Sequence, residues 1–198
     1  FETHLPESEN VKITPHGSGL SGLSIAGPKS RALLAKITDE DVSPENFRFM
    51  DSLKIDIGMV SCFVVRVSYT GDLGYELWMT PDYQSYVMEL LQKESESYGE
   101  EFGLRLFGLR ALNSLRLEKN YGSWAREYRP IYGPLEAELG RFVAHDKEAD
   151  FIGKRAVIQE KSDGGKASLT LRLRTFVVEA NDADVIGDEP IWFEDEVK

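Results

Sequence analysis

The chain has 198 residues, of which 41% are hydrophobic, and its 34 acidic and 23 basic side chains give a formal net charge of −11. This composition can bury a sizeable core, which excludes a disordered tail or a disulfide-stapled miniprotein, and the length suggests one or two domains. The acidic balance argues against nucleic acid as the main partner, because phosphate backbones repel it. No apolar run approaches the ~20 residues that span a bilayer, so we expect a soluble protein with no membrane contact.

The residue types that most often form metal or nucleophile sites are few and scattered. Cys62 is the single cysteine, so no internal disulfide can form, and its apolar neighbours indicate a buried thiol rather than a nucleophile. A chain without disulfides fits a reducing compartment, and we expect the cytoplasm. His4, His16 and His145 share no spacing with one another or with Cys62 that would form a zinc site, so we predict no metal.

The first predicted unit is a strand, a turn and a helix. Residues 1–19 are polar and rich in proline and glycine, which is typical of a connecting segment. A short strand follows over 20–26, the Gly27-Pro28 pair ends it, and apolar residues at helical spacing predict a helix over 29–37. An acidic loop then leads to the next strand.

A β-hairpin is the clearest local prediction. Residues 59–69 are dense in β-branched and aromatic side chains, residues 70–74 supply two glycines for a turn, and residues 75–79 return as a second strand. The period of two places alternate side chains of the return strand on opposite faces. One face carries Tyr75, Leu77 and Met79, and the other carries Glu76 and Trp78.

Two amphipathic helices are predicted after the hairpin, over 81–98 and 104–120. Strands and helices that are segregated along the chain in this way indicate an α+β sandwich.

The C-terminal part reads as a separate small β unit. Irregular chain over 125–140 precedes a short helix over 154–159, and a turn near 162–166 marks the predicted boundary. Alternating leucines predict a strand over 167–179, and the last segment, 190–198, reads as a strand with no partner after it. With no initiator methionine at the start, we expect a piece of a longer protein.

Glu76 is a carboxylate embedded in an apolar strand. It could be a solvated residue on the polar face of a two-sided hairpin. Trp78 shares its face, however, and an indole is usually covered. A carboxylate beside an aromatic wall can accept two parallel N–H bonds from a guanidine-like edge of a ligand.

Arg110 is the second polar candidate, within the predicted helix. It could be a solvated arginine that pairs along the helix, for instance with Glu118. However, residues 104–141 hold seven basic and four acidic side chains, a local charge of +3 within an acidic chain. Such a region would suit a small molecule that carries carboxylates.

Five ordered motifs resemble the glycine-cleavage T protein (aminomethyltransferase) family. They are residues 23–28, 68–77, 108–118, 134–137 and 150–154. Two further segments, 121–130 and 139–143, look closest to the tetrahydrofolate domain of dimethylglycine and sarcosine dehydrogenases.

The resemblance implies a tetrahydrofolate site. The family's pterin-binding glutamate falls on Glu76, a tyrosine that lines the same pocket falls on Tyr69, and the arginine of the helix motif falls on Arg110. The family's catalytic aspartate belongs to a segment N-terminal to the first motif, and no residue here matches it. We therefore expect binding residues but no catalytic residue, and a fragment that is inactive alone.

The resemblance also implies a fold and a division of the chain. Residues 1–160 would form the central and connecting part of the folate-binding domain, a ferredoxin-like α/β sandwich module that is incomplete at its N-terminus. Residues 161–198 would begin a small, incomplete C-terminal β-barrel.

The implied activity is folate-dependent one-carbon transfer. Tetrahydrofolate would capture the carbon of an N-methylamine such as dimethylglycine or sarcosine, or an aminomethyl group, as 5,10-methylene-tetrahydrofolate. FAD would belong only to a domain outside this chain, so a flavin domain in cis or a carrier protein is a possible partner. The location would be the mitochondrial matrix in a eukaryote. Two alternatives stay open: a folate-binding module without transferase activity, like relatives in RNA modification or iron–sulfur assembly, and a structural domain that binds no folate.

Overall fold

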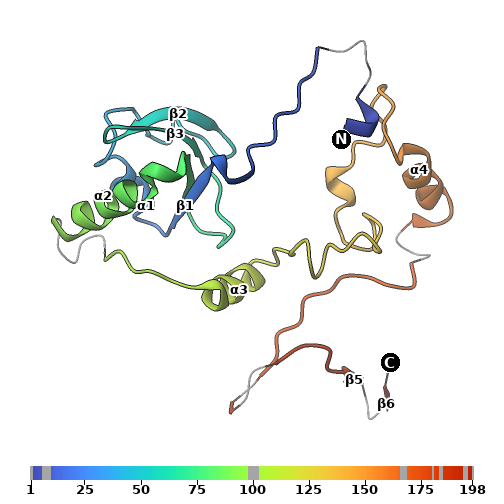
Figure 1. The fold of residues 1–198 in the computed structure, drawn as a ribbon. Coiled ribbons are helices and arrows are strands. Elements are labelled where there is room, and N and C mark those ends of the chain that lie inside the picture. Colours follow the sequence, from blue (N-terminus) through green and yellow to red (C-terminus); the bar gives the residue numbers. More distant parts are fainter. Residues whose placement is uncertain are drawn as a thin grey trace. The chain divides into compact units, whose positions relative to one another are not determined.

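A computed structural model describes most of the chain (Figure 1). The described residues are 2–5, 10–97, 103–165, 169–179, 181–182, 185–193 and 196–197. Contacts divide the chain into two compact units, Phe1–Tyr121 and Gly122–Lys198. Each unit is described by itself below.

The first unit is built on a four-stranded antiparallel sheet with the order β1-β4-β3-β2. The strands are β1 Ser21–Ala26, β2 Ser52–Ile57, β3 Val60–Val65 and β4 Gly74–Met79. The central strand β4 pairs with β1 on one side and with β3 on the other. An antiparallel sheet combined with helices confirms the predicted α+β class at this level.

Two helices complete this core. Helix α1 spans Ser30–Leu34 and contacts β4, and α2 spans Gln84–Ser97 after the short turn η3 Pro81–Tyr83 and contacts β1 (Figure 1). Their apolar side chains join those of one sheet face in a single cluster. As the period of two predicts, Tyr75, Leu77 and Met79 of β4 are fully buried in it.

The opposite sheet face carries Glu76 and Trp78, and Trp78 is 38% exposed. The indole is therefore less covered than the sequence suggests.

Strand β2 is not predicted from the sequence. Its Ile55 and Ile57 are buried and alternate with the outward-facing Lys54 and Asp56, a period of two that the acidic composition of the preceding loop obscures. A two-residue turn at Gly58, where φ is 58°, then joins β2 to β3.

Several predicted boundaries shift. Strand β3 ends at Val65 rather than near residue 69. Helix α1 is shorter than the predicted 29–37, because 3₁₀-type bonds from the Lys36 and Ile37 amides end it. Helix α3 spans Leu109–Glu118 and starts five residues later than predicted, because the backbone of Gly108 is extended. Two 3₁₀ turns, η1 Glu2–His4 and η2 Gly17–Gly19, lie in the predicted connecting segment.

The second unit has little regular structure among its described residues. It contains η5 Gly140–Phe142, helix α4 Lys154–Ser162, and the two-residue strands β5 Trp192–Phe193 and β6 Glu196–Val197. Helix α4 confirms the predicted short helix and extends it.

Two C-terminal strand predictions are wrong. The described residues 169–179 form no strand, since a strand requires a paired neighbour, although the Leu173 amide donates to the Glu136 carbonyl. The last segment does have a partner, because β5 pairs with β6 in an antiparallel hairpin. The β-barrel and the domain boundary at residue 160 stay predictions.

Candidate functional site

A polar loop, residues 66–73, connects β3 to β4 and is fixed by its own short side chains. The hydroxyls of Ser68 and Thr70 lie 2.7 Å apart, and the Asp72 amide donates to Thr70 Oγ1 over 3.3 Å. The Leu73 amide donates to Asp72 Oδ1 over 2.7 Å. Side chains of this kind satisfy turn backbone locally, so the loop has a defined shape.

The same loop is bonded to the turn between β1 and α1. The Leu73 carbonyl accepts a bond of 2.8 Å from the Gly27 amide and one of 3.1 Å from Ser30 Oγ. At Gly74 a Cβ atom would lie only 2.7 Å from the Ile25 carbonyl oxygen. This close approach leaves no room for a side chain at residue 74, so glycine is required there. The two hydrogen bonds to the Leu73 carbonyl hold the two turns together.

A cavity of about 1000 Å³ adjoins these turns in the first unit. Its lining comes from β1, the following turn and α1, the 66–73 loop, β4, α2, residues 103–108 and α3. The lining residues are Leu23, Ser24, Ile25, Ala26, Gly27, Pro28, Lys29, Ser30, Leu33, Tyr69, Thr70, Glu76, Met88, Leu91, Gly103, Leu104, Arg105, Leu106, Phe107, Gly108, Leu109 and Leu112. The wall is mainly apolar, with one carboxylate from Glu76 and two cations from Lys29 and Arg105. Its size and lining suit an organic ligand that has a few polar groups.

Glu76 is the carboxylate of this cavity. It lies opposite Ser24 in the β1–β4 pair and opposite Val65 in the β3–β4 pair. Its side chain is half-buried, and its Oε2 accepts a 3.2 Å hydrogen bond from the indole Nε1 of Trp78. Glu76 is therefore partly ordered by its own strand while it lines the cavity.

Tyr69 lines the same cavity, and its ring stacks on Tyr121 with centroids 6.4 Å apart and planes 16° from parallel. Tyr121 is in turn held by Arg116, which is only 3% exposed. Arg116 donates to the Tyr121 carbonyl over 2.8 Å and to Asn113 Oδ1 over 2.9 Å. The end of α3 thus supports one aromatic wall of the cavity.

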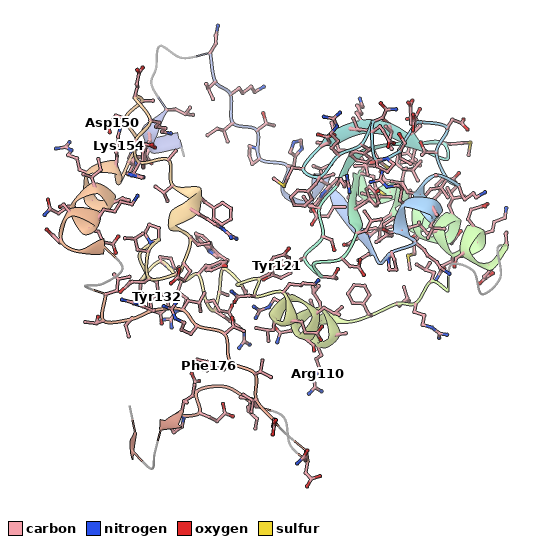
Figure 2. The ribbon with its side chains drawn as sticks, turned by 180° about the vertical axis from the view of Figure 1, so that it is seen from behind. Arg110, Tyr121, Tyr132, Asp150, Lys154 and Phe176 are labelled. Carbon is pink, nitrogen blue, oxygen red and sulfur yellow. The ribbon has the colours of Figure 1, made fainter. Side chains whose placement is uncertain are left out.

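Arg110, the third residue predicted for the site, is not among the lining residues. It is exposed on α3, and its side chain points away from the helix into open space (Figure 2). The structure therefore brings Tyr69 and Glu76 together and leaves Arg110 apart from them. No sequence motif marks Lys29 or Arg105 as site residues, although Arg105 belongs to the locally basic stretch 104–141.

Comparison with known proteins identifies the family. The model of the GCVT N-terminal domain matches residues 1–147. The chain belongs to this family. It is 39% identical to mitochondrial dimethylglycine dehydrogenase of Mus musculus over 175 residues, which cover 88% of the chain and 19% of that protein. It is 37% identical to an aminomethyltransferase of Caldanaerobacter subterraneus subsp. tengcongensis over 159 residues, or 80% of the chain and 41% of that protein.

The chain therefore spans less than half the length of each of these relatives. Among solved structures, it is similar to a heterotetrameric sarcosine oxidase from Corynebacterium sp. U-96, with a TM-score of 0.40 and 17% identity over 52% of this chain and 49% of that one. The predicted family, including its resemblance to dimethylglycine dehydrogenase, is confirmed by the sequence relatives.

Two buried titratable groups of this GCVT domain lie in the core rather than in the cavity. Burial, with a smaller contribution from Asp56, raises the pKa of the Cys62 thiol to about 11, so the thiol is protonated at neutral pH and serves as a core residue, as predicted. Burial also raises the pKa of Tyr75, against the opposing charges of Arg31 and Arg66.

The described part of the chain contains neither a metal-binding cluster nor a membrane-spanning helix. Its histidine, cysteine and acidic side chains form no group of three or more that could hold a metal ion. No described helix is both long and apolar enough to cross a membrane.

Proposed function

We propose that this GCVT domain binds tetrahydrofolate in the cavity lined by Tyr69 and Glu76 and thereby serves folate-dependent one-carbon transfer. The observation that carries the proposal is the position of Glu76, which presents a carboxylate to a large apolar cavity in a chain of this family. Aminomethyltransferases and dimethylglycine dehydrogenases among the relatives favour the same activity.

The chemistry of the lining fits folate. The pterin presents an N–H and NH₂ pair that a carboxylate accepts in bidentate fashion, and Glu76 is the one carboxylate of the lining. Apolar side chains of the lining and the ring of Tyr69 can cover the flat ring system. The carboxylates of folate's glutamate tail require positive charge, which Lys29 and Arg105 supply at the cavity wall. Arg110 stays a predicted third anchor, and Arg105 is the arginine already at the cavity.

The proposed reaction belongs to the longer protein. A flavin domain in cis, or a carrier protein, would deliver the carbon of dimethylglycine, sarcosine or an aminomethyl donor as an electrophile. Folate supplies the nucleophilic nitrogens that accept this carbon as 5,10-methylene-tetrahydrofolate. Glu76 and Tyr69 would hold and orient the pterin, and we assign no catalytic residue to this chain. In a eukaryote the proposed location is the mitochondrial matrix. In the proposed complete fold, residues 1–160 belong to the folate-binding domain with its ferredoxin-like module, and residues 161–198 begin a C-terminal β-barrel.

The test uses the full-length protein that carries this domain. We expect it to form 5,10-methylene-tetrahydrofolate from an N-methylated glycine and tetrahydrofolate, measured by a coupled dehydrogenase assay. Glu76→Ala should lower folate-dependent product formation at least about tenfold, because a charged acceptor of two hydrogen bonds is removed. Glu89→Ala, on the exposed face of α2 and outside the cavity, is the matched control and should leave the rate unchanged. Folate binding without any product would instead support the alternative of a pure binding module.

A further inference from the structure

The indole of Trp78 is hydrogen-bonded to the carboxylate of Glu76. The two residues are separated by one position in β4, so their side chains leave the same face of the sheet. The 3.2 Å bond from Trp78 Nε1 engages Glu76 Oε2. A carboxylate offers about four acceptor positions, so this bond leaves room for a ligand to donate to the same group.

The indole lies over a glycine of the neighbouring strand. Gly22 is the register partner of Trp78 in the β1–β4 pair. A Cβ atom at Gly22 would lie 3.1 Å from Cε3 and Cζ3 of the indole and 3.3 Å from Cη2. Such contacts are tighter than ordinary van der Waals distances, so any side chain at Gly22 would displace the ring. The φ of Gly22 lies outside the left-handed region, so the requirement for glycine comes from space rather than from backbone conformation.

We propose that Trp78 is a positioning residue that orients the carboxylate of Glu76 for its ligand. Gly22, which has no side chain, leaves the space in which the indole lies. The inference rests on the proposed function, because it assigns Glu76 to folate. Its physical basis is preorganisation: the terminal torsion of a glutamate is broad, and a fixed hydrogen bond restricts it before the ligand arrives. Less conformational freedom is then lost on binding, and affinity rises.

A double-mutant cycle on the full-length protein that carries this domain tests the role of the indole N–H. Trp78→Phe retains an aromatic side chain but removes the N–H donor together with the indole atoms that lie over Gly22, so the Glu76→Ala background is needed to separate the two losses. Isothermal titration calorimetry with 5-formyl-tetrahydrofolate would compare it with Glu76→Ala and with the double variant. We expect Trp78→Phe to raise Kd by roughly three- to tenfold, the cost of ordering one additional side chain when the ligand binds. In the Glu76→Ala background the same substitution should change Kd less than about twofold, because no carboxylate is left to orient.

The outcomes separate this inference from the proposed function. If Glu76→Ala binds as tightly as wild type, or if the wild type does not bind, the folate assignment is wrong. If Glu76→Ala loses affinity but Trp78→Phe does not, folate binding stands and the positioning role is refuted. A Trp78→Phe loss that persists in the Glu76→Ala background would also refute it, since the ring would then act by packing alone.

Gly22→Ala tests separately whether the absence of a side chain at Gly22 keeps the indole in position. It should weaken binding about as much as Trp78→Phe, and adding it to Trp78→Phe should have a smaller effect than it has alone. Gly19→Ala is the matched control, because a Cβ atom at Gly19 would meet no other atom within 4 Å and Gly19 lies outside the cavity. Its Kd should equal that of wild type. Wild-type affinity in Gly22→Ala would refute this role of Gly22. Thermal melting followed by circular dichroism would verify that each variant is folded.

Discussion

The sheet has one buried face and one open face, and truncation of Leu77 tests this arrangement. Leu77 is fully buried in the central strand β4, between Leu23 of β1 and Val64 of β3. Leu77→Ala removes three buried carbon atoms, which at about 0.8 kcal/mol per methylene group costs about 2.4 kcal/mol. The cavity left in a close-packed core raises the expected loss of unfolding free energy to about 3–4 kcal/mol. Urea denaturation followed by circular dichroism measures it.

Phe63→Ala is the comparison variant for this prediction. Phe63 is larger than leucine but lies on the open face of β3 and is 50% exposed. Its truncation should cost only about 1 kcal/mol, because much of its surface is already in water. If Phe63→Ala destabilised the protein more than Leu77→Ala, the assignment of the two faces would be wrong.

Three further predictions concern the core and the turn beside the cavity. Tyr75→Phe should raise the free energy of unfolding by about 1 kcal/mol, because the buried Tyr75 hydroxyl has no hydrogen-bond partner among the described atoms; a lower urea midpoint would contradict this. Cys62 should resist a thiol reagent at about pH 8 until the protein is unfolded. Because burial raises its pKa from 9.0 to about 11, its contribution to the free energy of unfolding should be fully present below pH 9 and lost as the pH rises to about 11. Cys62→Ala should reduce this decrease of the unfolding free energy with pH. Gly74→Ala should cost about 1–3 kcal/mol by urea denaturation, because its Cβ would lie 2.7 Å from the Ile25 carbonyl oxygen, and an unchanged midpoint would refute the close approach of β1 and β4.

Local periodicity accounts for the parts of the fold that the sequence predicts well. The alternation in β4 predicts which side chains are buried, and it holds because burial along one strand depends on a fixed period of two. Strand β2 has the same alternation, but its three apolar side chains alternate with charged residues and follow an acidic loop, so the sequence pattern does not stand out from the loop. The failure over 169–179 has another cause. Alternation there predicts a strand, but a strand also requires a partner, which no local pattern reveals.

The residues of the candidate site also include some that the sequence predicts and some that it does not. Tyr69 and Glu76 were found because they belong to a contiguous motif, and the structure brings both to one cavity. Lys29 and Arg105 could not be selected, because they reach the cavity only through the approach of residues 103–108 to the turn after β1. The sequence placed Trp78 beside Glu76 but gave no sign that the indole N–H bonds to the carboxylate, which depends on rotamers and on the absence of a side chain at Gly22.

The affinity of the full-length protein for 5-formyl-tetrahydrofolate tests the central claim most directly. Calorimetry would compare the wild type with Glu76→Ala, and Glu89→Ala would serve as the control for loss of one exposed carboxylate. The account predicts saturable binding to the wild type and to Glu89→Ala, and a Kd at least about tenfold higher for Glu76→Ala. Equal affinity of the wild type and Glu76→Ala, or no binding by either, would contradict it.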